Sequence, residues 1–124
     1  MNRREETAPD IIALTAGEPA GIGPDLCIQI AQQPSAFQRV IIADPELLRS
    51  RTQLLGLPLE LSTYDPDALA APQAAGQLCV LPVQLAAPCQ PGILDQRNAS
   101  YVLDTLRLAG EGCLAGHFSA VVTA

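Results

Sequence analysis

Short runs of mostly apolar residues punctuate this chain and predict its strands. The predicted strands lie at residues 10–15, 39–43, 59–64, 78–83 and 118–124. Pro82 lacks the N–H that a sheet interior needs, so it indicates a bulge or an edge position in its strand. Residues 65–77 are rich in Ala and Pro without a hydrophobic period, which is typical of a surface loop.

The segments between these strands carry the start and stop signals of helices. Pro24, directly after Gly23, predicts a first helical turn, and apolar residues then recur at helical spacing. These are Leu26, Cys27, Ile30 and Ala31. Asp44 followed by Pro45 predicts the cap and first position of a second helix, which Gly56 is expected to close. Its expected apolar face consists of Leu47, Leu48, Leu54 and Leu55.

The longest predicted helix follows Asn98, which we expect to cap it, and stops at Gly116. Its expected apolar face consists of Val102, Leu106, Ala109 and Cys113. Strands that alternate with helices predict an α/β fold of layered helices on a mostly parallel sheet. The 124 residues are too few for two domains.

Composition and charge exclude several functions. The net charge is −6, and the basic residues are scattered arginines with no lysine, which argues against a nucleic-acid partner. The charged residues 1–7 and the short apolar run at 11–16 fit neither a signal peptide nor a membrane span, so we expect a cytoplasmic protein. The four cysteines, at positions 27, 79, 89 and 113, have no metal-ligand spacing, which indicates ordinary thiols.

The glycine-rich turn at residues 16–25 is the first candidate site, because such a turn brings backbone close to a ligand at a helix N-terminus. It matches the dinucleotide fingerprint poorly, since Leu26 replaces the third glycine, and no lysine supplies a phosphate loop. The residues alone leave two alternatives open, a tight structural connection or the lining of a ligand pocket.

The other candidate site residues give weaker indications of a function. Glu18 is placed to touch a ligand, whereas Asp25 compensates a helix dipole. His117 follows a helix end and is expected to be solvated. Residues 92–98 read as a turn with a helix cap.

The turn sequence TAGEPAGIGPD, from Thr15 to Asp25, resembles the N-terminal signature of the 4-hydroxythreonine-4-phosphate dehydrogenase (PdxA) family of vitamin B6 synthesis. Stretches at residues 54–59, 91–106 and 111–124 agree with the family in order and spacing. Asp25 stands where many members have Glu. The resemblance implies the first third of a two-domain fold like that of isocitrate and isopropylmalate dehydrogenases, so residues 1–124 are expected to be incomplete as a domain.

The resemblance further implies an NAD-dependent oxidation of 4-phosphohydroxy-L-threonine, followed by loss of CO2 to give 3-amino-2-oxopropyl phosphate. It implies a homodimer with a divalent metal, Zn, Mg or Co, in the full-length protein. By analogy, Gly17, Glu18, Ala20 and Gly21 line the cofactor pocket. No catalytic or metal-binding residue of the family falls within this chain.

We therefore expect an N-terminal fragment of such a dehydrogenase, inactive by itself and without bound cofactor. Two alternatives remain open. One is a shortened, non-catalytic paralogue that acts as a binding or regulatory module. The other is a different nucleotide-binding enzyme whose first strands converge on this turn.

Overall fold

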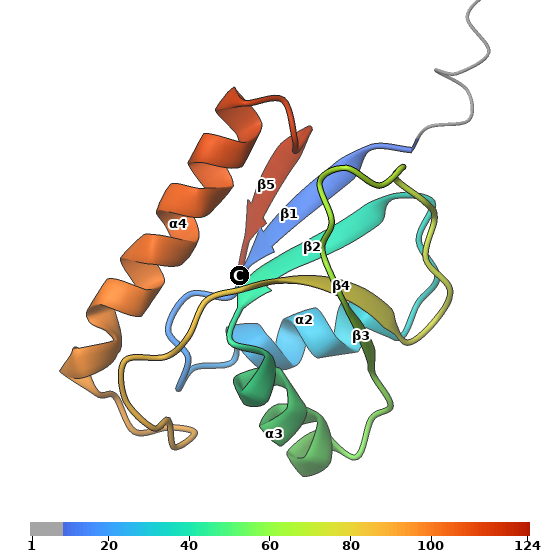
Figure 1. Cartoon of the computed structure of the whole chain (residues 1–124). Helices are drawn as coiled ribbons and strands as arrows, with labels where there is room; N and C mark the ends of the chain where they lie inside the picture. The colour runs from blue at the N-terminus through green and yellow to red at the C-terminus, as the bar shows by residue number, and fades with distance from the viewer. Residues whose placement is uncertain (1–8) are drawn as a thin grey trace, which may run out of the picture.

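A five-stranded parallel sheet forms the centre of the chain in the computed structural model, which describes residues 9–124 (Figure 1). The charged residues 1–7 lie outside the described part. The strand order is β3-β4-β2-β1-β5, and every neighbouring pair is parallel. The strands are β1 (Ile11–Thr15), β2 (Gln38–Ala43), β3 (Glu60–Thr63), β4 (Gln77–Pro82) and β5 (Ala120–Thr123). The predicted α/β class with a parallel sheet is confirmed.

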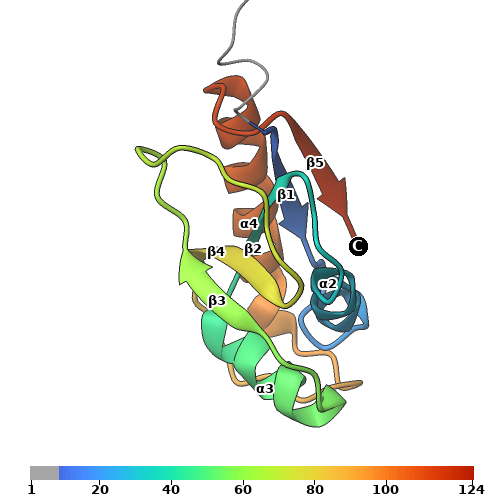
Figure 2. The ribbon, with the colours of Figure 1, turned by 90° about the vertical axis from the view of Figure 1, so that its right-hand side faces the viewer.

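Helices cover both faces of this sheet (Figures 1 and 2). On one face lie α2 (Gly23–Ala31) and α3 (Pro45–Leu55), and on the other lies α4 (Ala99–Leu114), preceded by the 3-10 turn η1 (Gln96–Asn98). Parallel sheets are buried on both faces, so their strands read as continuous apolar runs. Every residue of β2, the central strand, is accordingly buried. No helix within residues 9–124 has the length and apolar character needed to cross a bilayer.

Three helix ends follow the predicted chemistry. Asp44 caps α3, where its Oδ1 accepts a hydrogen bond from the backbone N–H of Glu46 at 2.9 Å. Gly56 ends the same helix in the left-handed conformation, with φ of 66°. Gly116 adopts φ of 82° after α4, and the N–H of His117 bonds back to the carbonyl of Gly112, which is the Schellman pattern.

The buried face of α4 differs from the predicted one. The residues that face the core are Tyr101, Thr105, Ala109 and Gly112. Leu106 is 44% exposed, so only Ala109 of the predicted face is fully buried. Tyr101 fixes the rotation of the helix because its hydroxyl accepts a hydrogen bond from the N–H of Asp44, at 3.0 Å. This hydrogen bond, rather than the spacing of apolar residues, sets which face of α4 is buried.

The exposure of several apolar helix residues also differs from what the apolar spacing indicates. Leu26 and Ile30 of α2 and Leu54 of α3 are exposed, at 45%, 53% and 68%. Pro82 occupies an edge position, as predicted, because the β3 side of β4 has no strand partner there. It is the last residue of β4, pairs in register with Ala43, and lies beyond the point where β3 stops pairing.

Asn98 occupies the cap position of α4 but does not cap it through its side chain. Its Oδ1 accepts a hydrogen bond from the N–H of Ala87 at 2.9 Å, and its Nδ2 donates to the carbonyl of the same residue at 3.2 Å. The side chain is fully buried, so it clamps the long β4–α4 connection instead.

Candidate functional site

The carboxyl ends of β1, β2, β4 and β5 meet at one edge of the sheet, where open α/β folds bind their ligands. Three segments gather there: the glycine-rich turn after β1, the start of α3 after β2, and the β4–α4 connection at residues 83–98. The end of β5 joins them, since the N–H of Ala124 donates to the carbonyl of Thr15 at 2.9 Å. The predicted turn therefore lies at the edge that a ligand would occupy.

Two glycines of the turn are required by its backbone. Gly17 has φ of 69°, and a Cβ there would lie 3.0 Å from the carbonyl oxygen of Ala124. A Cβ on Gly23 would lie 1.9 Å from the carbonyl oxygen of Ala16, which no side chain tolerates. Glu18 folds back on the turn, since its Oε1 accepts a hydrogen bond from the N–H of Ala20 at 3.2 Å. The backbone of the turn is therefore tightly constrained at each of these positions.

A buried arginine from α3 holds the inner side of the turn. Arg51 is 3% exposed and donates hydrogen bonds to the carbonyls of Pro19 and Gly21. It also forms an ion pair with Asp25, at 2.9 Å from Nη1 to Oδ1. Asp25 therefore binds Arg51 as well as lying in the first turn of α2. Sequence reasoning missed Arg51, although its spacing from the buried Leu47 and Leu48 places it on the inward side of α3.

The four residues predicted to bind the cofactor differ in exposure. Gly17, Glu18 and Gly21 are partly exposed, whereas Ala20 is buried. The carbonyl of Ala20 accepts a hydrogen bond from the N–H of Gly92 at 2.8 Å, so the β4–α4 connection lies against the turn. Cofactor binding by these residues stays a prediction, and the accessible ones are Gly17, Glu18 and Gly21.

A polar network built on Asp44 lies at the same edge of the sheet as the glycine-rich turn. Its Oδ2 accepts a hydrogen bond from the N–H of Leu85 at 2.8 Å, while Oδ1 caps α3. Both carboxylate oxygens are therefore engaged in structure. Burial raises the pKa of Tyr101, which contacts Asp44, to about 12, so its phenol is neutral and serves as a hydrogen-bonding anchor.

The β4–α4 connection ends in the predicted turn and cap. Gly92 adopts φ of 83°, and Asp95 caps η1 by accepting a hydrogen bond from the N–H of Arg97 at 3.0 Å. Hydrogen bonds from the Arg97 guanidinium and backbone lower the pKa of Asp95 to about 2. A shallow pocket of about 250 Å³ lies beside this pair.

Thr15, at the end of β1, places a hydroxyl at this edge of the sheet, although the sequence singled it out only as the first residue of the turn motif. Its hydroxyl is buried and, alone among the buried side-chain polar atoms of residues 9–124, has no hydrogen-bond partner there. A buried hydroxyl without a partner costs free energy, so Thr15 is a polar position at this edge that the contacts of residues 9–124 do not satisfy.

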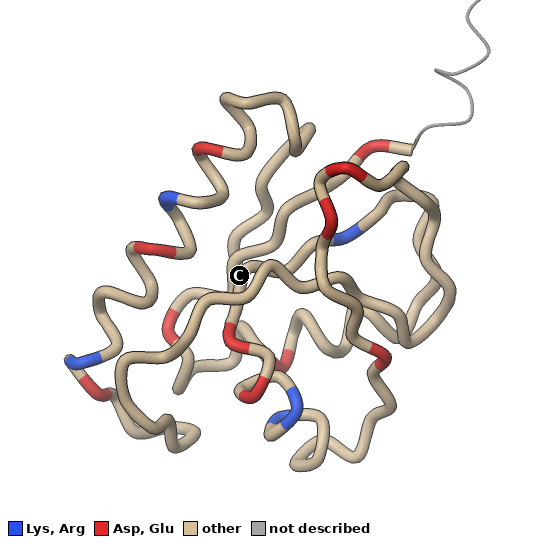
Figure 3. Tube along the Cα trace, viewed as in Figure 1, with Lys and Arg blue, Asp and Glu red and all other residues tan. Residues whose placement is uncertain are grey.

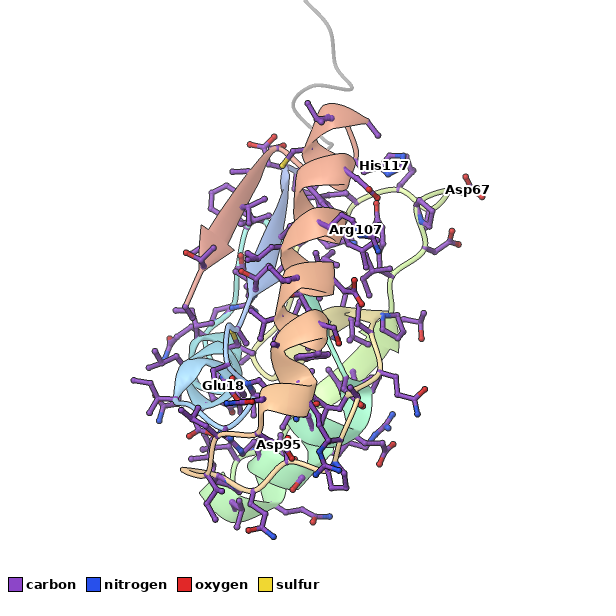
Figure 4. All side chains as sticks on the ribbon, turned by 90° about the vertical axis from the view of Figure 1, so that its left-hand side faces the viewer. Glu18, Asp67, Asp95, Arg107 and His117 are labelled. Carbon is purple, nitrogen blue, oxygen red and sulfur yellow. The ribbon has the colours of Figure 1, made fainter. Side chains whose placement is uncertain are left out.

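His117 and the glycine-rich turn lie at opposite ends of α4 (Figure 4). His117 is exposed, as predicted. Within the described residues, no three His, Cys, Asp or Glu side chains are close enough together to hold a metal ion. The residues present therefore do not fit a metal site. The arginines of the described part are scattered along the trace, on β2, α3, η1 and α4, without a run of neighbouring basic positions (Figure 3). The four cysteines are free thiols.

Comparison with known proteins gives the chain its relatives. A model of the family described as "Pyridoxal phosphate biosynthetic protein PdxA" matches residues 35–124. The 4-hydroxythreonine-4-phosphate dehydrogenase of Thioalkalivibrio sulfidiphilus is 57% identical over 90% of the chain, and that of Saccharophagus degradans is 54% identical over 93%. Matches this long extend past the family-model region to the N-terminal part of the chain. In both cases the chain spans 34% of the relative's length.

Solved structures agree in fold. The crystal structure of 4-hydroxythreonine-4-phosphate dehydrogenase from Klebsiella pneumoniae superimposes with a TM-score of 0.82 at 26% identity, covering 95% of this chain and 37% of that one. The enzyme from Burkholderia phymatum gives a TM-score of 0.75 at 20% identity, over 93% and 36%, and supports the fold alone. Family model, relatives and fold therefore agree: this chain belongs to the PdxA family of pyridoxal phosphate biosynthetic proteins, and it spans about a third of the length of its curated relatives.

Proposed function

We propose that this chain is the N-terminal third of an NAD-dependent dehydrogenase that oxidises and decarboxylates 4-phosphohydroxy-L-threonine in pyridoxal 5'-phosphate biosynthesis. The observation that carries the proposal is its 57% identity, over 90% of its length, to a protein named 4-hydroxythreonine-4-phosphate dehydrogenase. The glycine-rich turn at the carboxyl edge of the sheet supports it, since α/β enzymes bind their ligands at that edge.

In this proposal the chain supplies a wall of the active-site cleft. Gly17, Glu18 and Gly21 present the accessible backbone and carboxylate of the turn, with Ala20 beneath them. Arg51 fixes the turn from inside, so that its position is set before any ligand binds. NAD accepts the hydride when bound, and the turn contributes contact and orientation to it.

The catalytic and metal-binding groups belong, in this proposal, to the remaining two-thirds of the full-length enzyme. Residues 9–124 contain no cluster of three His, Cys, Asp or Glu side chains that could hold a metal ion, so no step of the reaction is assigned to them. The full-length protein is proposed to be a cytoplasmic homodimer that takes its divalent metal and phosphorylated substrate outside this segment.

A chimeric enzyme tests the proposal. Residues 1–124 would replace the matching third of the Thioalkalivibrio sulfidiphilus relative, and NADH formation would be followed with 4-phosphohydroxy-L-threonine, NAD and a divalent metal. We expect activity within about tenfold of the unaltered relative, because the replaced third is 57% identical. A folded chimera without activity, beside an active relative, would instead favour the non-catalytic binding module.

A further inference from the structure

The sheet face that carries α2 and α3 is covered over β4, β2 and part of β1 but open over β5. α3 and α2 lie over β4, β2 and part of β1, where the core cluster includes Ile28, Leu48 and Leu78. Over β5 the same face carries no helix in the described part of the chain (Figure 2). Val122, which points to this face, is 53% exposed.

A groove of about 470 Å³ follows this open strip between α2 and β5. This groove, here called the β5 groove, has a mostly apolar lining that includes Ile12, Leu14, Ile30, Phe37, Ala120 and Val122. Arg39 is the cation at its wall, and it is already occupied by Gln73 Oε1 at 2.9 Å and the carbonyl of Ile30 at 2.8 Å. The groove therefore offers apolar surface and no unpaired charge.

The outer flank of α2 extends this surface. Ile22, Leu26 and Ile30 are spaced four residues apart, and they are 71%, 45% and 53% exposed. They lie on the exposed side of α2, away from its buried residues Cys27, Ile28 and Ala31. An apolar ridge beside an apolar groove is the surface that an α/β fold buries under a neighbouring helix.

Spacing shows that one helix fits there. Neighbouring strands lie about 4.8 Å apart and packed helices about 10 Å apart, so each helix covers roughly two strands. α3 and α2 account for the strands from β4 to the near side of β1, which leaves room for one helix over β1 and β5.

Crossover handedness indicates where such a helix does not come from. The chain moves across the sheet from β1 to β2 in one direction and from β4 to β5 in the other, so right-handed crossovers place α2 and α4 on opposite faces, as observed. A crossover from β5 to a strand beyond it would continue in the second direction. Its helix would then lie on the α4 face and leave the β5 groove open.

We propose that the β5 groove is the docking site for one amphipathic helix from the part of the full-length dehydrogenase outside residues 1–124, and that this helix does not belong to the crossover that directly follows β5. The inference rests on the proposed function. Curated relatives are about three times the length of this chain, so they have the additional polypeptide that such a helix requires.

The test compares two charge substitutions in two backgrounds. Ile30→Glu places a carboxylate in the groove, and Leu54→Glu places one on α3 at a site 68% exposed and outside the groove. Thermal unfolding is measured for the 124-residue chain and for the chimera with the Thioalkalivibrio remainder. We expect Ile30→Glu to lower the Tm of the chimera by about 5 °C or more, since a carboxylate is buried there, and both substitutions to change the chain alone by about 2 °C or less.

Each other outcome overturns the docking proposal. Equal effects of the two substitutions in the chimera would show that the groove stays open. A dimer of the 124-residue chain that Ile30→Glu dissociates, measured by sedimentation, would make a second copy the occupant. Dehydrogenase activity of the unsubstituted chimera is a separate readout. Activity with a silent Ile30→Glu refutes only the groove, whereas a sensitive Ile30→Glu in an inactive chimera refutes only the proposed function.

Discussion

Arg51 shows how one side chain connects the core of this chain to its candidate site. It lies on α3 and donates hydrogen bonds to the carbonyls of Pro19 and Gly21 in the glycine-rich turn and to Asp25 at the start of α2. A glycine-rich turn has high conformational freedom in the unfolded chain, so it needs such a clamp to hold one geometry. The turn is visible in the sequence, whereas its clamp is not, because the two are thirty positions apart.

Removing this clamp should be costly. Arg51→Met is expected to lower the free energy of unfolding by about 2–3 kcal/mol, because it leaves Asp25 and two buried carbonyls without their partner. Arg49→Met, in the same helix, is the matched control, since Arg49 is exposed and pairs only with exposed Glu46. We expect it to cost about 0.5 kcal/mol or less. Urea unfolding measures both, and equal losses would remove Arg51 from its role.

Tyr101 gives a prediction for the pH dependence of stability. Burial raises the pKa of its phenol to about 12, above the usual value near 10, so the folded state favours the neutral form. Its contribution is complete below about pH 10 and is lost as the pH rises from about 10 to about 12. Absorbance of phenolate at 295 nm should therefore show a late-titrating tyrosine that is lost in Tyr101→Phe, whereas Tyr64, whose pKa burial also raises, remains in both proteins. A wild-type titration in which Tyr101 ionises near pH 10 would contradict its buried role.

At the scale of elements, the sequence predicts the order of strands and helices along the chain and three helix ends, but not the rotation of each helix. Asp44, Gly56 and Gly116 act through local backbone chemistry, and all three behave as expected. The face of α4 depends on distant groups, since Tyr101 is fixed by Asp44 from another element. Apolar spacing cannot report such a contact, which explains why Leu106 is exposed.

For Asn98 and for the candidate site, too, local features are predictable from the sequence and long-range contacts are not. The position of Asn98 before α4 follows from local preference, yet its side chain is used to clamp Ala87. The glycine-rich turn follows from its sequence, whereas its burial under the β4–α4 connection depends on packing between segments far apart in the chain.

Two glycines of α4 allow a direct test of its packing. A Cβ on Gly112 would lie 2.3 Å from the buried ring of Phe118, whereas a Cβ on Gly110 meets nothing within 4 Å. Gly112→Ala should destabilise the chain by about 2 kcal/mol through overpacking. Gly110→Ala should stabilise it by about 0.5–1 kcal/mol, because alanine favours the helix. Circular dichroism during urea unfolding compares them, and a stabilising Gly112→Ala would place α4 in another rotation.

At the scale of the whole molecule, the chain has the core of an α/β unit and only one wall of a proposed active site. The turn, the Asp44 network and the end of β5 converge at one edge, while the described residues contain no cluster of three side chains that could hold a metal ion. The purified 124-residue chain is therefore expected to form no NADH from 4-phosphohydroxy-L-threonine with NAD and Zn, Mg or Co. Metal-dependent NADH formation by this chain alone would show that it contains a complete site.

The central claim is that residues 1–124 are a third of a larger dehydrogenase, and the intact mass of the protein isolated from its own cells tests it most directly. We predict a mass about three times the 13.0 kDa of this chain, as expected from relatives of which it spans 34%. A protein of 13.0 kDa would contradict the claim, and the short chain would then have to act as a binding module without the dehydrogenase chemistry of its relatives.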